Sequence, residues 1–199
     1  MDIRTLPAGP LGANCYLLSS GSAGVILDPG GEAGRIAREC GAMGMAPAAI
    51  LLTHGHFDHV GGVEELTRLF PGLSVYIHPG DVQEGPSQFS WTGIPDWQPL
   101  SDNQALSFGE IELKVIHTPG HSPGSVVFRW EDCLFTGDTL FRGSIGRTDL
   151  PGGDGRAMLA SLERLAGLEG DFRVYPGHDA PTTLDWERRA NPFLREAMG

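Results

Sequence analysis

The chain has 199 residues and a formal net charge of −11, with 14 Lys and Arg against 25 Asp and Glu. This balance argues against nucleic acid or an anionic membrane surface as a partner, because both bind clustered basic side chains. The three cysteines form no CxxC pair and no run of about 18 apolar residues occurs. We therefore expect a soluble, cytoplasmic protein with one domain spanning residues 1–199, which acts on a small molecule.

Short apolar runs between glycine and proline turns predict strands mixed with helices. Strands are expected over residues 14–19, 25–28, 49–52, 75–77, 111–116, 125–130, 133–135 and 172–175. Helical spacing predicts helices over about 32–43, 63–70, 156–168 and 184–189. This order indicates an α/β (α+β) arrangement, in which two sheet layers are flanked by helices. The segment 86–103 has no clear period and is expected to form a surface loop near the mouth of the site.

Seven polar side chains of related chemistry follow the expected strands. Four lie in one loop after the strand at 49–52, and the others each follow a separate strand. They are His54, His56, Asp58, His59, His121, Asp138 and His178. Imidazole and carboxylate groups suit zinc, iron or manganese, and the lack of clustered cysteine argues against a structural zinc finger. The sequence therefore predicts an open, catalytic metal site.

The spacing within the first loop suits two ions. An extended backbone alternates its side chains, so His54 and His56 can reach one ion while Asp58 and His59 turn toward another. Four such residues within one short loop are difficult to explain as packing. Asp28 ends a strand, where it could support the ligands or simply form a turn.

These motifs carry a resemblance to a known family. Residues 53–59 match the HxHxDH signature of the metallo-β-lactamase superfamily, and residues 118–121, 137–138 and 176–178 resemble its later ligand motifs in the right order. The resemblance runs from the first hairpin to His178 and implies a four-layer αββα sandwich with two divalent metal ions at one edge, zinc being expected and iron or manganese being alternatives. It implies the ligands His54, His56 and His121 for the first metal, Asp58, His59 and His178 for the second, and a bridging Asp138.

The expected chemistry is attack by a hydroxide held between the ions. A bound cation lowers the pKa of water to about 7, so hydroxide is available at neutral pH. Asp58 and Asp138 are the candidate catalytic carboxylates, which orient the hydroxide and accept its proton. A thiolate, from a thiol of pKa about 8.5, departs without a strong general acid, so a thioester suits these residues better than a lactam.

Two stretches resemble one branch of the superfamily. Residues 137–141 and 143–149 are similar to the short bacterial glyoxalase II-like (hydroxyacylglutathione hydrolase-like) proteins. This implies hydrolysis of a small-molecule thioester such as S-lactoylglutathione. Asp149 stands where a glutathione-contacting tyrosine is expected, which leaves glutathione recognition open. About 20 residues follow His178, so we expect no C-terminal helical glutathione-binding domain.

Arg147 is the candidate substrate-binding residue, because a guanidinium binds a carboxylate bidentately. A loop salt bridge with Asp149 or Asp154 is the alternative interpretation. His78 precedes Pro79 at a helix entrance and His117 lies within an apolar strand, so both are assigned structural or capping roles outside the site.

Three other functions are compatible with parts of the pattern. The nearest is a mononuclear iron persulfide dioxygenase, an oxidoreductase for which the resemblance assigns the iron to His54, His121 and Asp138. A phosphodiesterase or nuclease fits the acidic balance less well. A binding module with structural metals fits mixed His and Asp ligands less well, because structural zinc sites are usually closed and rich in cysteine. The sequence gives no indication of the oligomeric state.

Overall fold

Two six-stranded sheets form the centre of the protein, and the computed structural model describes residues 2–83 and 88–199. The first sheet contains β1 (Asp2–Ala8), β2 (Ala13–Ser20), β3 (Ala23–Leu27), β4 (Ala46–Leu51), β5 (Ser74–Ile77) and β6 (Gln98–Pro99), paired in that order. The second contains β7 (Ala105–Phe108), β8 (Ile111–His117), β9 (Val126–Trp130), β10 (Cys133–Gly137), β13 (Arg173–Pro176) and β14 (Thr182–Thr183). Its strand order is β14-β13-β10-β9-β8-β7.

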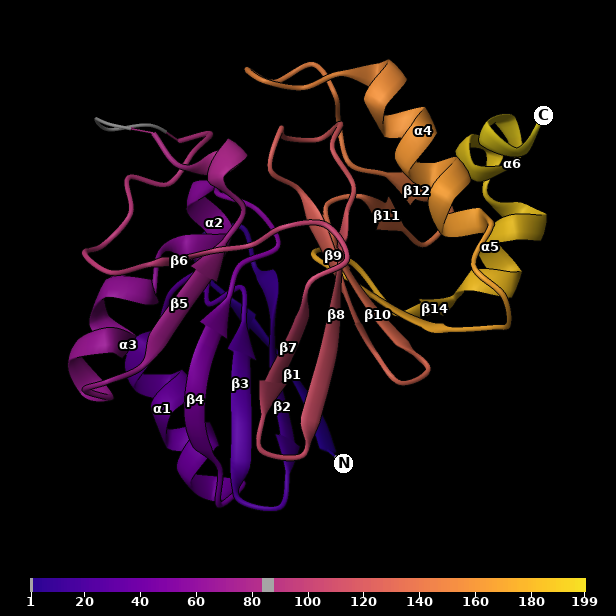
Figure 1. The fold of residues 1–199 in the computed structure, drawn as a ribbon. Coiled ribbons are helices and arrows are strands. Elements are labelled where there is room, and N and C mark those ends of the chain that lie inside the picture. The colour runs from indigo at the N-terminus through magenta and orange to yellow at the C-terminus, as the bar shows by residue number, and fades with distance from the viewer. Residues whose placement is uncertain (1, 84–87) are drawn as a thin grey trace.

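Helices lie on the outer sides of the two sheets (Figure 1). The first half of the chain supplies α1 (Ala33–Ala42), α2 (Phe57–Val60), α3 (Val63–Leu69) and the 3-10 turn η1 (Pro79–Asp81). The second half supplies α4 (Gly155–Ala166), α5 (Leu184–Ala190), α6 (Pro192–Met198) and a ribbon of β11 (Leu140–Phe141) with β12 (Ser144–Ile145). Among the described residues, no helix has the length and apolar character needed to cross a bilayer. The order of helix, sheet, sheet and helix confirms the predicted αββα sandwich.

Apolar side chains fill three layers of this sandwich. Leu18 and Leu27 point between the sheets, whereas Leu17 and Ile26 on the same strands pack with α1 and α3, as the period of two in a strand requires. A third cluster joins α4 and α6 to the second sheet. Because the first sheet is covered on both faces, its central strands are apolar throughout rather than alternating. Phe128 is fully buried between the sheets. Phe128→Ala is therefore expected to lower the free energy of unfolding by about 3–5 kcal/mol, as measured by urea denaturation.

The expected strands and helices are all present, with ends shifted by a few residues. The sequence interpretation missed β1, α6 and several shorter elements, namely α2, β6, β7, β11, β12 and β14. β1 is an edge strand with mixed burial that contains Pro7, a residue which edge positions tolerate. α6 begins at Pro192 after Asn191, whose side chain accepts hydrogen bonds from the next turn. Its start is marked by these two residues rather than by apolar periodicity.

The segment after η1 differs in part from the expected surface loop. Residues 86 and 87 lie outside the described residues, and β6 occupies 98–99. Trp91 is 7% exposed and belongs to the apolar layer beneath α1 and α3. Its backbone N–H donates to the Asp81 carbonyl oxygen at 2.8 Å, and its carbonyl oxygen accepts from Gln83 at 3.0 Å. The buried indole and these two hydrogen bonds anchor this part of the loop. The lack of periodicity had indicated an exposed segment instead.

Four strands end where the predicted ligands begin. β4 leads into the loop at 53–59, and β8, β10 and β13 lead into residues 118–121, 137–138 and 176–178. β10 and β13 are parallel. β8 and β10 are each antiparallel to β9, so β8 runs in the same direction as β10 and β13. Their carboxyl ends therefore meet at one edge of the sandwich.

Candidate metal centre

The loop that leaves β4 is fixed by buried polar groups. Thr53 donates its backbone N–H and its Oγ1–H to the Asp28 carboxylate at 2.7 and 2.6 Å. Gly55 passes so close to the neighbouring segment that a Cβ there would lie 2.6 Å from the Asp81 carbonyl oxygen. His56 has an extended backbone immediately before α2, which turns the chain between the two pairs of predicted ligands. The loop is thus held in one path rather than free to adjust.

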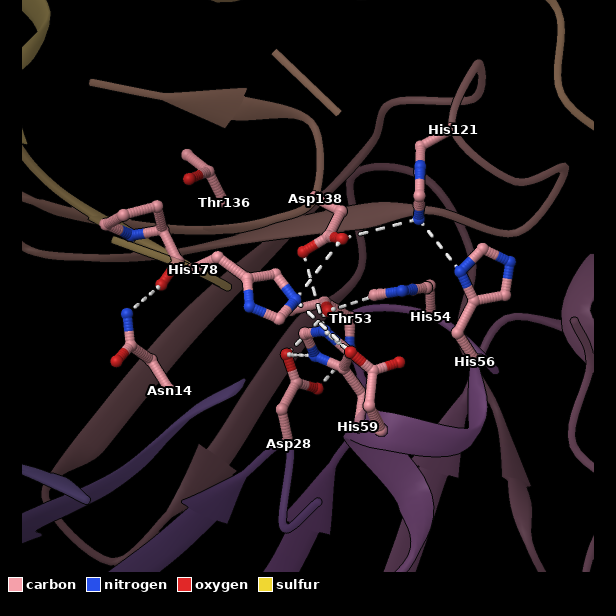
Figure 2. Close-up of polar contacts among 12 residues, drawn as sticks. Asn14, Asp28, Thr53, His54, His56, His59, His121, Thr136, Asp138 and His178 are labelled. Atoms are coloured by element: carbon pink, nitrogen blue, oxygen red, sulfur yellow. Dashed lines mark hydrogen bonds and ion pairs between the residues drawn. The ribbon is translucent and has the colours of Figure 1, made fainter. Parts of the chain in front are cut away.

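The structure brings all seven predicted ligands to one place (Figure 2). Two groups of three have ligand atoms within 4.8 Å of one another, and each group combines two residues of the first loop with one from a later strand end. The first triad is His54, His56 and His121; the second triad is Asp58, His59 and His178. Their roles as ligands stay predictions, but the grouping is the one that the alternating loop backbone favours.

Asp138 lies between the two triads. Its Oδ1 is 3.4 Å from His59 Nε2, and its Oδ2 is 3.5 Å from His121 Nε2 and 3.7 Å from His178 Nε2. Asp138 also forms a third group of potential ligands with His54 and His59. One carboxylate therefore faces both triads, as a bridging ligand would.

The donor atoms of this cluster suit a divalent cation. In the described part of the chain, the buried side-chain atoms without a hydrogen-bond partner are His54 Nε2, His56 Nε2, His59 Nε2, Asp138 Oδ1 and Ser90 Oγ. Buried polar atoms are normally paired, so three such atoms on members of one potential ligand group, His54, His59 and Asp138, require an explanation. A positive ion satisfies imidazole lone pairs and a carboxylate oxygen together.

The outer nitrogens of three histidines are held by acceptors. Nδ1 of His54 lies 3.0 Å from Thr53 Oγ1, and Nδ1 of His121 lies 2.8 Å from the Arg147 carbonyl oxygen. Nδ1 of His59 lies 3.1 Å from the Asp28 carboxylate. Each Nδ1 therefore donates to its acceptor, which leaves Nε2 as the ring nitrogen directed into the cluster. Asp28 accordingly serves as support for the ligands as well as forming the turn after β3.

The charge states of the first triad favour ligation. Burial, reinforced by the neighbouring His59, holds the pKa of His54 well below its usual range. Burial and the neighbouring His121 lower the pKa of His56 to about 4. Both imidazoles are therefore neutral near pH 7, which is the form that binds a metal.

In the second triad and Asp138 the charged forms of the side chains are favoured, unlike the neutral imidazoles of His54 and His56. Burial opposes ionisation of Asp138, but the imidazoles around it outweigh burial and lower its pKa to about 2. Burial also opposes protonation of His59, yet Asp138 and Asp28 raise its pKa well above the ordinary value. The hydrogen bond with Asp58 raises the pKa of His178. This half of the cluster is negative enough to hold protons on its histidines, and a cation at the same place would replace them.

A buried carboxylate behind the first triad was missed by the sequence interpretation. Asp81 is 1% exposed, and its Oδ2 accepts from Gly55 N–H at 2.9 Å and Ser122 Oγ–H at 2.6 Å. Its Oδ1 accepts from Gly124 N–H at 2.6 Å. Asp81 thus joins the loop that carries His54 and His56 to the loop that carries His121. Its position after a strand was visible in the sequence, but its burial was not.

The loop that carries His178 is held by β2. The Asn14 side chain donates to the carbonyl oxygens of Pro176 and Asp179, each at 3.0 Å. Tyr16 Oη donates to the same Pro176 oxygen at 2.6 Å. Figure 2 shows Asn14 beside the His178 segment. The sequence interpretation also missed these contacts, because they join residues about 160 positions apart.

The two remaining histidines lie outside the cluster, as expected. His78 caps η1 by accepting from Gly80 N–H at 3.1 Å. His117 ends β8, and its ring stacks on that of His78 with centroids 4.2 Å apart.

Arg147 forms the loop salt bridge that was the alternative interpretation. Its Nε and Nη2 contact the two carboxylate oxygens of Asp149 at 2.7 and 2.8 Å, and both side chains are exposed. A substrate carboxylate would have to displace Asp149 from Arg147. The role of Arg147 in binding substrate therefore stays a prediction, while its carbonyl oxygen positions His121.

A pocket opens onto the cluster. It has a volume of about 560 Å³, and its lining includes His56, Asp58, His121, Asp138 and His178. Members of both triads are thus accessible from one cavity of a size that holds a small molecule. The arrangement can bring a carbonyl compound, water and two cations together.

The comparison with known families identifies the chain. A model of the metallo-β-lactamase superfamily matches residues 8–178. The chain belongs to the metallo-β-lactamase superfamily. It is 37% identical to the "Probable metallo-hydrolase YqgX" of Bacillus subtilis, over 98% of each chain. It is 33% identical to the "Hydroxyacylglutathione hydrolase GloC" of Haemophilus influenzae, again over 98% of each. Its relatives in the superfamily therefore include one protein named as a probable metallo-hydrolase and one named as a hydroxyacylglutathione hydrolase.

Solved structures of the superfamily share the fold. The BLEG-1 B3 metallo-β-lactamase superposes with a TM-score of 0.89 at 37% identity, covering 97% of this chain and 99% of the other. TTHA1623 in a di-iron-bound form gives a TM-score of 0.82 at 41% identity, covering 96% and 99%. ETHE1 from Myxococcus xanthus gives 0.85 at 24% identity, covering 100% and 91%, a likeness of fold alone. The fold binds divalent metals, and one of these relatives holds two iron ions.

Proposed function

We propose that this superfamily member is a metal-dependent hydrolase that cleaves a small-molecule thioester of the S-lactoylglutathione kind, within one domain over residues 1–199. The first triad is the proposed ligand set of one cation, the second triad that of the other, and Asp138 the bridge. Zinc is the proposed metal, with iron or manganese as alternatives. The relative named as a hydroxyacylglutathione hydrolase supports this substrate class.

One observation carries the proposal. Buried imidazole nitrogens and a carboxylate oxygen lack hydrogen-bond partners and face one another at the base of a pocket. A structural metal site would be closed, whereas this one is open to a ligand of small-molecule size. The geometry therefore supports catalysis rather than mere stabilisation of the fold.

The chain's own groups supply proton transfer. When bound, two such cations polarise a carbonyl group and lower the pKa of water to about 7. Burial opposes ionisation of Asp58, but the hydrogen bond with His178 lowers its pKa, so the carboxylate is charged at neutral pH. Asp58 lines the pocket and is therefore placed to accept a proton from the attacking water. A thiolate leaves without further protonation, so the reaction requires no general acid once cations have replaced the protons on the histidines of the second triad.

A persulfide dioxygenase is the second candidate. Its single iron would use His54, His121 and Asp138, which lie together here, since Asp138 Oδ2 is 3.5 Å from His121 Nε2. The two functions differ in metal content and in oxygen use. Two cations per chain and no oxygen uptake with glutathione persulfide would exclude the dioxygenase. One iron per chain with oxygen uptake would exclude the hydrolase.

The direct test measures metal content and hydrolysis of S-lactoylglutathione together. His56→Ala should abolish hydrolysis and leave a folded protein, because the side-chain hydrogen bond that it removes is with another member of the first triad, His121. Asp138→Ala should lower both metal content and rate. His78→Ala, outside the cluster, is the control and should match the wild type. Retention of both cations by the Asp138 variant would show that the bridge assignment is wrong.

A further inference from the structure

The mouth of the pocket is lined by apolar side chains from four separate segments. They are Leu11, Phe57, Phe89, Phe141, Ile145 and Leu150. Leu11 is 61% exposed and Phe57 is 39% exposed, so neither side chain is part of the buried core. Exposed apolar groups gathered at the rim of a cavity mark a surface that a ligand covers. Two of the phenylalanines also touch the cluster, since the rings of Phe89 and His56 lie 5.8 Å apart and those of Phe141 and His178 lie 6.1 Å apart.

Positively charged side chains are scarce at the same place. Within residues 2–83 and 88–199, the pocket lining includes one Lys or Arg side chain, Arg147, and Asp149 already binds it through two oxygens. The residues outside the described part, Met1 and 84–87, contain no Lys or Arg. The chain as a whole carries a net charge of −11. A carrier with several carboxylates or phosphates would therefore find no unpaired cationic side chain in the described lining and would be repelled at longer range.

We propose that the substrate carries an apolar arm next to the scissile thioester, and that contact with this arm, rather than recognition of a charged thiol carrier, sets the preference of the site. The arm is either the acyl chain or the thiol chain, and the six apolar residues of the mouth cover it. The inference rests on the proposed function, because it concerns the substrate of the same pocket.

The test uses two series of neutral thioesters with the metal-loaded protein. In one series the acyl chain on N-acetylcysteamine grows from acetyl to octanoyl; in the other, acetyl is fixed and the alkyl thiol grows. In the series that matches the arm, kcat/KM should rise about two- to fourfold per methylene until the mouth is filled. S-Lactoylglutathione should be a poorer substrate than the best neutral thioester. A flat response in both series, or a clear preference for S-lactoylglutathione, would overturn the inference.

Matched variants separate the apolar mouth from general effects. Leu11→Ser removes an exposed rim residue and should flatten the dependence on chain length without lowering metal content. Leu69 is also exposed but does not line the pocket, so Leu69→Ser is the control. It should keep the wild-type dependence of rate on chain length. Asp149→Ala frees Arg147 and should raise the rate ratio of S-lactoylglutathione to the neutral thioester by about two- to fivefold. Equal behaviour of the two leucine variants would contradict the assignment.

A binding measurement keeps this inference distinct from the proposed function. Non-hydrolysable S-alkyl thioethers of both series can be titrated by calorimetry, which requires no turnover. If no thioester is hydrolysed but affinity rises with chain length, the hydrolase proposal fails and the apolar mouth stands. If thioesters are hydrolysed but neither rate nor affinity depends on chain length, the hydrolase proposal stands and the apolar arm is refuted.

Discussion

Replacement of Asp81 is the sharpest test of how the metal centre is held. Asp81→Ala removes the acceptor for Gly55 N–H, Gly124 N–H and Ser122 Oγ–H, at 2.9, 2.6 and 2.6 Å. Ser122 retains a second partner in Ser125, so two backbone donors remain unpaired. An unpaired buried donor costs about 1–3 kcal/mol, and the total loss of unfolding free energy should be about 3–5 kcal/mol.

The effect on metal binding should be confined to one triad. Asp81 joins the loops of His54, His56 and His121, whereas it bonds to no residue of the second triad. Loss of such a supporting group typically weakens a metal site by about 10–100-fold. A competing chelator should therefore remove one of the two cations from the variant at a chelator concentration about 10–100-fold lower than the wild type requires. The other cation should keep its wild-type affinity.

Asp81→Asn refines the same experiment. An amide oxygen at the Oδ2 position still accepts from Gly55 and Ser122, but the amide NH₂ then faces the Gly124 N–H. We expect a stability loss of about 1–3 kcal/mol and a smaller effect on the first cation. Urea unfolding of the metal-free protein measures the first quantity and chelator competition the second. A destabilised Asp81→Ala protein that keeps both cations at wild-type affinity would refute the positioning role.

Three further changes have defined outcomes. Asn14→Ala releases the loop of the second triad and should weaken the other cation about tenfold, the reverse of the Asp81 result; equal weakening of both would contradict this. Gly177→Ala places a Cβ 2.3 Å from Asp138 Oδ1 and should remove at least one cation, by elemental analysis, from a protein whose circular dichroism is unchanged. Burial raises the pKa of Cys40 to about 11 and of Cys133 to about 12, so both thiols stay protonated at about pH 8 and should resist iodoacetamide until the protein unfolds. Fast labelling of the native protein at that pH would show the thiols to be accessible thiolates.

The gathering of the candidate ligands at one site was predictable because their residue types and spacing are local features of the sequence. His54, His56, Asp58 and His59 stand in one loop, and each later ligand directly follows a strand, so strand order alone brings them to one edge. The strands themselves were predictable because apolar runs bounded by glycine and proline are local signals. β1 was not predictable, because an edge strand with mixed burial has no clear alternation of apolar and polar residues.

The supporting residues were not predictable for the opposite reason. Asp81 and Asn14 act through contacts with loops 41 or more positions away, apart from one bond to Gly55, and nothing in their own neighbourhoods distinguishes them from turn residues. Arg147 illustrates a third case. The sequence allowed this side chain to bind either a substrate carboxylate or one of two nearby residues, Asp149 and Asp154, and the structure shows that Asp149 binds the guanidinium. Residue identity sets what a group can do, whereas tertiary contacts set what it is free to do.

Each triad draws two residues from the first half of the chain and one from the second, and these residues leave different sheets. A cation in either triad would therefore fasten the two halves of the sandwich together, in addition to any catalytic part. Ligands that bind only the folded chain add stability in proportion to the logarithm of their concentration, about 4.1 kcal/mol at a thousandfold excess over Kd. Metal supply then affects folding, because without cations the two halves of the sandwich lose this connection at an edge where the carboxylates of Asp58 and Asp138 repel each other.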